Sequence, residues 1–250
     1  MEFYISLKPE IIAHIAGFPI SNSFILSVLT ASLLLGCGFF AVWQLKKVPG
    51  RIQNGVEIVV DGILNFMSQT LGDREQAKKF FPLVATVFLF ILVNNWMGLV
   101  PGVGSFGRYE ETAVGELAFV PFFRSANSDL NTTLALTLVT MIAIQLYGIR
   151  QLGFLGHFSK FFTFTKGPIY FFVGILELIA EFAKVLSFSF RLFGNIFAGE
   201  VLLVIVMTLV PLVVPFPFLL LELFVGLVQA LVFSMLAMIF AKIATETVEH

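Results

Sequence analysis

Residues 177–200 read ELIAEFAKVLSFSFRLFGNIFAGE and lie inside a long apolar segment, yet they include an arginine, Arg191. Lys184, Asn195 and three carboxylates lie in the same stretch. A charged side chain at the centre of a bilayer costs roughly 2.5–3.5 kcal/mol on insertion scales. Something has to compensate this cost, and we expect that compensation to be the function.

Helical geometry arranges the polar residues of this stretch into a stripe. At about 100° per residue, the polar and small side chains fall within about 40° of Arg191, and Glu200 falls on the opposite side. Small residues beside Arg191 would let a neighbouring helix come close. The pattern predicts a helix that presents Arg191 to one partner and Glu200 to another environment. The stripe consists of Glu177, Ala180, Lys184, Ser187, Arg191, Asn195 and Ala198.

The composition indicates an all-α polytopic membrane protein. Of 250 residues, 58% are hydrophobic and only 12% are charged, about half the share in a soluble domain. The long apolar runs disfavour a β-barrel, whose strands alternate. A net charge of −1 gives no nucleic-acid footprint. The one cysteine, Cys37, excludes an internal disulfide, and three scattered histidines give no metal site. We expect no cofactor.

The apolar segments predict one membrane domain, 1–250, with five membrane-crossing helices after an N-terminal segment at 1–21. As a single helix, the fourth segment would be about 63 Å long, twice the hydrocarbon thickness. It is therefore either two spans with a break or one steeply tilted helix, and we expect the last helix to be tilted as well. The predicted crossings are 22–45, 80–100, 131–150, 169–210 and 218–244.

Residues 51–71 have a different pattern. Apolar residues recur on one helical face and polar residues on the other, which predicts an amphipathic helix in the membrane interface. The alternative is a helix packed on a soluble domain. The pair Asn94-Asn95, just before Pro101, indicates either interfacial anchoring or a hydrated, polar-lined cavity.

The loop charges predict the orientation. The basic loops alternate with an acidic loop at 101–130 and a proline-rich loop at 211–217 if segment 169–210 crosses once. This places the N-terminus outside and the C-terminus in the cytoplasm. The cytoplasmic basic residues would be Lys46, Lys47, Arg51, Arg74, Lys78, Lys79, Arg150, Lys160, Lys166 and Lys242.

The stretch RLFGNIFAGE, 191–200, resembles the signature of subunit a of the F-type ATP synthase, the stator channel subunit of its membrane sector. The resemblance covers most of the chain. Asn95 lies six residues before Pro101, Glu177 fourteen before Arg191, and SDLNTTLAL at 128–136 is similar to the start of another helix of the family. Gln229 matches the polar position of the last helix.

The resemblance implies a non-catalytic channel subunit with protons, lipid, a rotor ring of small hairpin subunits and the peripheral-stalk subunit b as partners. The residue matching Arg191 faces the ring carboxylates, and two half-channels reach the ring from opposite sides of the membrane. Some members have a histidine where Glu222 stands; here it and Glu200 are both acidic, and two carboxylates that close would share a proton, or one would titrate high. The implied proton-translocation residues are Arg191, Glu200, Glu222, Asn195, Gln229, Glu177 and Asn95.

Several roles have structural alternatives. Glu200, Glu222 and Asn95 would line the outer half-channel, and Glu177 the cytoplasmic one. Asn195 and Gln229 would orient water or Arg191, or else form interhelical hydrogen bonds. The alternative for Glu177 and Glu181 is a solvated helix end, with Lys184 reaching the interface. The alternative for Arg191 is a salt bridge within the chain.

Three other classes of protein compete with this interpretation. A self-contained secondary transporter of protons or cations would show internal repeats and a complete ion site. An intramembrane enzyme would show a catalytic motif in its spans, and a structural subunit would tolerate loss of Arg191. We expect the bacterial plasma (inner) membrane as the location, with plastid or mitochondrial membranes second. The coupling ion is the proton, with sodium as the alternative.

Overall fold

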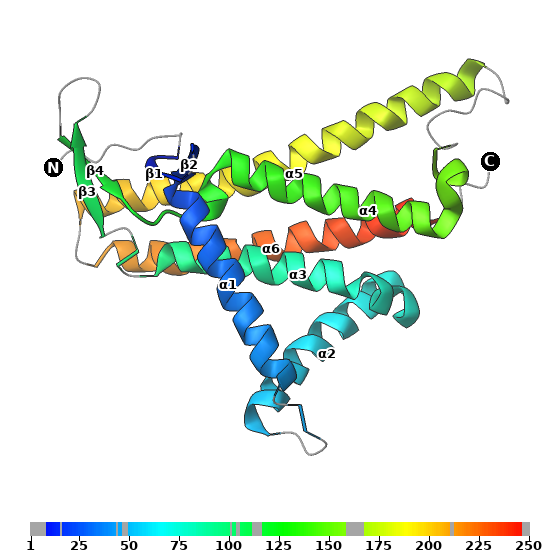
Figure 1. Ribbon diagram of the computed structural model, residues 1–250, viewed down its shortest axis with the longest axis horizontal. Helices are drawn as coiled ribbons and strands as arrows, with labels where there is room; N and C mark the ends of the chain where they lie inside the picture. The colour runs from blue at the N-terminus through cyan, green and yellow to red at the C-terminus, as the bar shows by residue number, and fades with distance from the viewer. Residues whose placement is uncertain are drawn as a thin grey trace. The chain divides into compact units, whose positions relative to one another are not determined.

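The computed structural model describes residues 9–15, 17–43, 45–46, 50–100, 102–103, 106–111, 117–158, 168–210 and 213–246. The predicted basic positions Lys47, Lys160 and Lys166 lie outside these residues. Figure 1 shows the elements that follow along the chain. They are β1 (Ile11–Ile15), β2 (Phe18–Ser21), α1 (Asn22–Trp43), α2 (Arg51–Leu71), α3 (Arg74–Leu99), β3 (Gly107–Glu111), β4 (Leu117–Pro121), the 3-10 helix η1 (Ala126–Ser128), α4 (Leu130–Phe158), α5 (Pro168–Leu209) and α6 (Pro215–Thr245).

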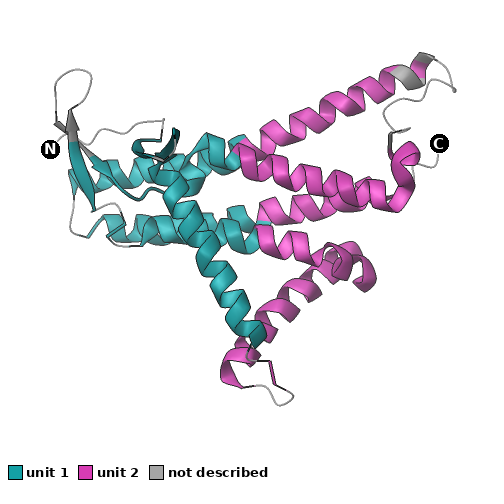
Figure 2. Cartoon of the chain, in the orientation of Figure 1, with its two compact units in different colours: residues 1–44, 88–133, 190–231 teal, residues 45–87, 134–189, 232–250 magenta. Residues whose placement is uncertain are grey.

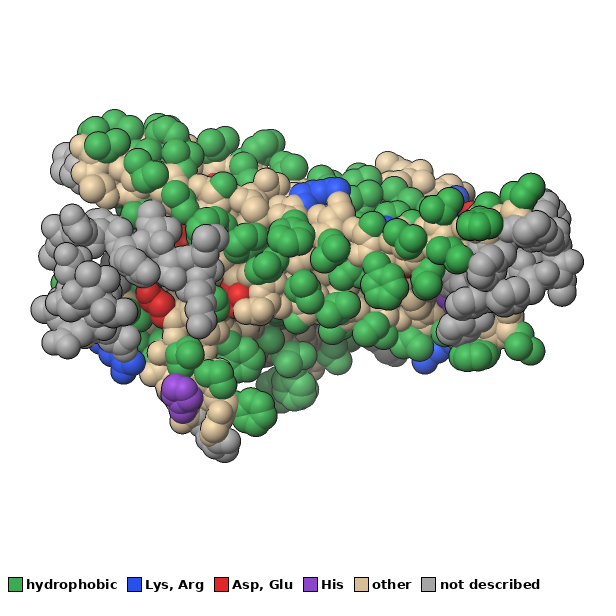
Figure 3. Space-filling view, turned by 90° about the horizontal axis from the view of Figure 1, so that it is seen from above, with side chains coloured by type: hydrophobic (Ala, Val, Ile, Leu, Met, Phe, Trp, Pro, Cys, Tyr) green, Lys and Arg blue, Asp and Glu red, His purple; other side chains and the backbone are tan. Residues whose placement is uncertain are grey.

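Five of the described helices, α1 and α3 to α6, are long and apolar enough to cross a membrane. Only 11% of the residues in the apolar window of α1 are buried inside the structure, so most side chains of this helix face the surrounding medium. Hydrophobic side chains also cover much of the face seen in Figure 3, with few charged groups among them. Apolar side chains stay exposed in this way when lipid replaces water. The predicted all-α polytopic class is confirmed.

Two compact units share the described helices, and α3 to α6 contribute residues to both (Figure 2). Unit 1 comprises residues 1–44, 88–133 and 190–231. Its buried apolar core comes from α1, α3, the β4–η1 segment, α5 and α6. The core side chains are Leu26, Ile91, Leu92, Val120, Ala126, Leu192, Ile196, Leu203 and Ala230.

Unit 2 comprises residues 45–87, 134–189 and 232–250. Aromatic rings tie its helices together in edge-to-face geometry, which is favoured by the ring quadrupoles. Phe80 of α3 lies 5.5 Å from Tyr147 of α4, and Phe188 of α5 lies 5.0 Å from Phe233 of α6, measured between ring centroids. These contacts leave α2 largely outside the core, with only Met67 and Leu71 of that helix buried.

The long apolar segment forms one helix, α5, of 42 residues. Of the two predicted arrangements, the structure therefore has the uninterrupted one. The physical reason is visible in the sequence, because Pro168 stands at the first helical position and the next proline is Pro211. Proline at the first position suits a helix start, and no proline lies between these two to break the hydrogen-bond ladder.

Helix ends differ from the predicted ranges at several places. α3 begins at Arg74, six residues before the predicted start at 80, so the polar residues 74–79 are helical. Asp73 Oδ1 accepts a hydrogen bond from the Glu75 backbone N–H at 2.9 Å and so satisfies one donor of the first turn. α4 continues to Phe158 through a kink at Gly153, whose φ of 76° suits glycine.

Short antiparallel hairpins accompany the helices. β1 pairs with β2, and β3 pairs with β4 inside the predicted 101–130 loop. In the second hairpin Gly107 lies opposite Pro121 and Tyr109 opposite Phe119. The hairpin matters for the site because β4 leads directly into the segment that carries Arg124.

Candidate functional site

The polar stripe of α5 faces outward within each unit. In unit 1, Arg191, Asn195 and Ala198 are exposed, and a Cβ added at Gly194 would meet no atom within 4 Å. In unit 2, Ala180 and Ser187 of the same stripe are exposed as well. The core-facing residues of α5 in unit 1 are others: Leu192, Ile196, Gly199 and Leu203. In unit 1 the stripe is therefore not covered by the rest of the unit, whereas in unit 2 its members Glu177 and Lys184 are half-buried.

Gln229 of α6 contacts α5 at the position of Arg191. Its side chain, only 6% exposed, donates a hydrogen bond to the backbone carbonyl of Arg191 at 3.3 Å. The contact is an interhelical hydrogen bond of the kind expected between membrane helices. It brings the predicted site residues Gln229 and Arg191 together and fixes the α5 backbone at Arg191.

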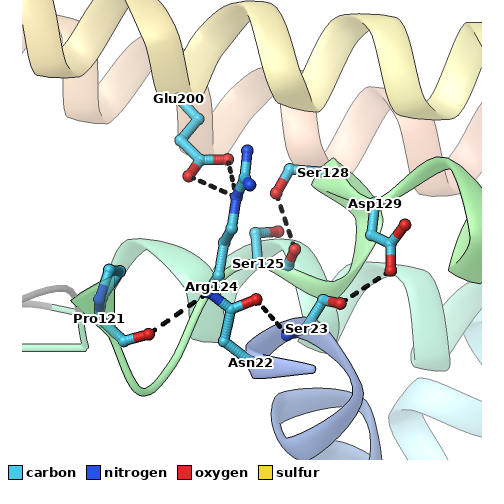
Figure 4. A network of polar contacts seen from close by, with 8 residues as sticks. All are labelled: Asn22, Ser23, Pro121, Arg124, Ser125, Ser128, Asp129 and Glu200. Carbon is cyan, nitrogen blue, oxygen red and sulfur yellow. Dashed lines mark hydrogen bonds and ion pairs between the residues drawn. The ribbon is translucent and has the colours of Figure 1, made fainter. Parts of the chain in front are cut away.

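Glu200 forms an ion pair that the sequence did not suggest. The Arg124 side chain, 8% exposed, donates from Nε to Glu200 Oε1 at 3.0 Å and to Oε2 at 3.3 Å (Figure 4). The guanidinium carbon lies 5.8 Å from the centre of the Phe197 ring, one turn earlier on α5. Arginine combines these two contacts well because its planar group can stack and donate at once.

Glu222 of α6 packs against the α5 backbone next to Glu200. A Cβ added at Gly199 would lie 2.0 Å from both Glu222 carboxylate oxygens, so a larger residue at this position would force the end of the Glu222 side chain to move. Glu222 is 7% exposed. The structure thus places the two predicted carboxylates, Glu200 and Glu222, around one glycine at the α5–α6 contact.

Asn95 of α3 also reaches α6. Its amide donates to the Gly226 carbonyl at 3.0 Å, and its Oδ1 accepts a hydrogen bond from Asn127 at 2.7 Å. The neighbouring Asn94 is fully buried, and neither of its amide atoms has a hydrogen-bond partner. Buried amides in native proteins are nearly always satisfied, often by water. Both amides of the Asn pair are buried within unit 1.

Helix caps anchor the segment that carries Arg124. Asp129 accepts a hydrogen bond from the Asn131 backbone N–H at 2.9 Å and so caps α4. Its other oxygen accepts one from the Ser23 hydroxyl at 2.8 Å (Figure 4). Ser21 accepts one from the Phe24 N–H at 3.2 Å and caps α1. Both helices therefore begin with a side-chain cap.

Unit 2 contains the other charged residues of α5. Glu177 is half-buried, and among the described residues no hydrogen bond or ion pair to its side chain is present. Glu181 forms an ion pair with Lys184 and accepts a hydrogen bond from Gln145 of α4 at 3.0 Å. The Lys184 ammonium lies 4.7 Å from the centre of the Phe240 ring. Neither Glu181 nor Lys184 is thus the freely solvated group considered above.

Sequence reasoning missed Arg124, Asn127 and Gln145. Their partners lie 76, 32 and 36 positions away along the chain, respectively. No periodic pattern connects residues at such separations. Within the residues that the structure describes, no group of three or more potential metal ligands is present.

Comparisons with known proteins agree with the resemblance of 191–200. The family model described as ATP synthase A chain matches residues 24–242. The chain is 34% identical to ATP synthase subunit a of Trichlorobacter lovleyi over 242 residues, 96% of this chain and 93% of the relative. It is 37% identical to the Gloeobacter violaceus protein of the same name over 214 residues, 86% and 79% of the two chains. It is 38% identical to the chloroplastic subunit a of Stigeoclonium helveticum over 229 residues, 90% and 85%. On this evidence the chain belongs to the ATP synthase A chain family.

Proposed function

We propose that this chain is the stator channel subunit of an F-type ATP synthase, which couples proton flow to rotation of a ring of small subunits. Family membership over residues 24–242 and the names of the relatives support this assignment. The observation that carries it in the structure is the exposed stripe of α5 around Arg191. A cation exposed on an otherwise apolar, outward-facing helix surface is costly in lipid, and a ring carboxylate facing it would compensate this cost.

The small residues of the stripe support close approach of a partner helix. Ala198 lies on the face of Arg191, Gly194 lies beside it, and no side chain of unit 1 fills the space at Gly194. Helices in membranes approach most closely where such residues line the contact. The proposed partner at this surface is therefore the ring, with one carboxylate of a ring subunit facing Arg191 at a time.

The mechanism follows from the cost of charge in lipid. A ring carboxylate can face lipid only when it is protonated, because a bare charge there is too costly. Beside Arg191 it ionises, since the guanidinium stabilises the anion. Protons reach it through one half-channel, travel with the ring, and leave through the other. Arg191 also blocks direct passage, because a fixed cation repels protons and does not release its own.

We assign the outer half-channel to the polar groups of unit 1 and the cytoplasmic one to Glu177. Glu200, Glu222 and Asn95 lie on three different elements, and their contacts bring α3, α5 and α6 together. The unpartnered amide of Asn94 would hydrogen-bond water in the same channel. Gln229 holds the α5 backbone at Arg191, and Asn195, one turn further along the stripe, would orient water or the guanidinium.

The remaining assignments concern the setting of the subunit. The chain would be non-catalytic, would contact the peripheral-stalk subunit b, and would reside in a bacterial plasma membrane. Its N-terminus would lie outside and its C-terminus in the cytoplasm, with α2 in the interface. The exposed apolar residues of α2, which include Ile52, Val56 and Val59, support an interfacial position for that helix.

The test uses the assembled complex in inverted membrane vesicles. Arg191→Ala should abolish ATP-driven acidification of the vesicles, because the ring carboxylate then has no cation beside which to ionise. Arg150→Ala, which removes an exposed arginine from α4, is the matched control and should pump at the wild-type rate. Normal pumping by the Arg191→Ala complex would exclude the proposed role.

A photocrosslinking amino acid tests the partner separately. Placed at Asn195, it should form a covalent product with the small ring subunit, because this position lies on the exposed stripe. Placed at Leu35, which is 75% exposed on α1, it should not. Crosslinking to the ring at Leu35 and not at Asn195 would contradict the assignment of the surface.

A further inference from the structure

One cation and two carboxylates meet in unit 1 at the contact of α5 and α6. Arg124 binds both oxygens of Glu200, at 3.0 and 3.3 Å. Glu222 lies against the backbone of Gly199, the residue next to Glu200. Among the described residues, no ion pair joins Glu222 to a cationic side chain. The two carboxylates are therefore not equivalent.

Arg124 is held in place from several directions. The next residue, Ser125, packs closely on Gly98 of α3. A Cβ added at Gly98 would lie 2.6 Å from the Cβ of Ser125. The Ser125 carbonyl accepts a hydrogen bond from Ser128 Oγ at 2.8 Å, and the Pro121 carbonyl accepts one from Asn22 at 3.3 Å (Figure 4). The Phe197 ring contacts the guanidinium from α5. A segment anchored in this way holds the Arg124 side chain in a fixed position against the Glu200 carboxylate.

The free-energy cost of a buried charge distinguishes Glu200 from Glu222. An ion pair away from water is tolerated only when both charges are compensated, and Arg124 compensates Glu200. A second buried anion beside this pair would lack a counter-charge, and such a group lowers its free energy by taking up a proton. Glu222, at 7% exposure, is that second group.

We infer that Arg124 is a positioning residue for proton transfer, which holds Glu200 in an ion pair and leaves Glu222 as the group that takes up and releases the proton. This inference rests on the proposed function. A proton from channel water forms an O–H bond with a Glu222 carboxylate oxygen. That bond breaks when the proton passes to the next base, water or a ring carboxylate. Glu200 and Arg124 keep their charges throughout.

Among the described residues of unit 1, few charged groups face the pair. Arg124 approaches from the segment before η1, and each carboxylate faces the other across Gly199, from α5 and from α6. α3 contributes the neutral amide of Asn95, which contacts Gly226, one turn after Glu222 on α6. The proton affinity of the site therefore depends mainly on Arg124.

The experiment measures the pH dependence of ATP-driven proton pumping by the assembled complex in vesicles. In Arg124→Gln, Glu200 loses its cation and competes for the proton, so proton release requires more alkaline conditions. We expect the profile to shift upward by about one pH unit, a change of about tenfold in proton affinity. Arg124→Lys, which keeps the charge, should stay near the wild-type profile. Arg108→Gln, an exposed arginine of β3, is the matched control and should match wild type.

A double variant separates positioning from a purely structural role. Arg124→Gln with Glu200→Gln removes both charges of the pair and leaves one carboxylate, so its profile should lie closer to wild type than that of Arg124→Gln alone. If Arg124→Gln does not assemble, assembly and pumping by this double variant support the inference. Two results would overturn the inference. One is a pH profile of Arg124→Gln that is not shifted, and the other is a double variant whose pumping is reduced by the product of the two single reductions. Pumping by Arg191→Ala would instead refute the proposed function, whatever Arg124 does.

Discussion

The hydroxyl of Ser23, in the first turn of α1, donates a hydrogen bond at 2.8 Å to the carboxylate of Asp129, which caps α4. The buried Asp129 carboxylate thus accepts hydrogen bonds from the first turns of both α1 and α4, although Ser23 and Asp129 are 106 residues apart in the sequence. Because the Arg124 segment leads directly into Asp129, the same contact also fixes the approach to the carboxylate site.

Asp129→Ala should destabilise the subunit. The change removes a cap, typically worth about 1 kcal/mol, and leaves the Ser23 hydroxyl without its acceptor, which costs about 1–3 kcal/mol more when buried. Asp129→Asn should lose less, because asparagine also caps helices well. Thermal unfolding of the purified complex in detergent, followed by circular dichroism, measures the effect. Asn131→Ala, an exposed neighbour, should leave the midpoint unchanged.

Gly199→Ala should displace the Glu222 carboxylate, because the new methyl group would overlap both of its oxygens. Overpacking of this kind costs about 1–3 kcal/mol, and we expect proton-driven ATP synthesis to fall by about tenfold. Gly36→Ala, on α1 with no atom within 4 Å of the added Cβ, is the control and should synthesise ATP normally. Equal rates for both variants would show that Glu222 does not need its observed position.

Glu181→Ala should destabilise the subunit by about 1–2 kcal/mol, since it leaves the half-buried Lys184 ammonium without its anion and Gln145 without its acceptor. Adding Lys184→Ala should restore part of this loss, because the two residues are coupled. The comparison is Glu75→Ala in an ion pair of the same spacing whose side chains are 52% and 80% exposed. Exposed pairs contribute about 0–1 kcal/mol, so a larger effect at Glu75 would contradict this account.

Cysteine labelling tests the orientation proposed for the chain. Cys37 is exposed on α1 but lies within a span, so a membrane-impermeant maleimide should leave it unmodified in intact vesicles. With Cys37 replaced by serine, Arg74→Cys should react only in inverted vesicles and Arg108→Cys only in right-side-out vesicles. Labelling of both positions from one side would contradict the five-crossing topology with its N-terminus outside.

The spans could be predicted because their signal is local. An apolar window without proline predicts the helical segment of α5, and the loop charges favour one crossing over two; the caps at Ser21 and Asp129 follow from residue types next to such windows. The start of α3 was less accessible, because polar residues such as Glu75 and Lys78 are compatible with a loop as well as a helix. Here an i,i+3 ion pair and the Asp73 contact favour the helix.

The contacts of the site depended on tertiary packing and could be predicted only in part. The helical stripe predicted which side of α5 carries Arg191, and the motif identified Glu200. The β3–β4 hairpin was missed because its pairing depends on two strands separated by a loop, and with it the direction from which Arg124 arrives. The motif likewise gave no indication that Gly199 provides the space for Glu222.

The dependence of Glu222 on Gly199 has an evolutionary consequence. A lineage that enlarges residue 199 has to let the carboxylate of residue 222 move or shorten that side chain. The two positions should therefore tend to change together across related genomes.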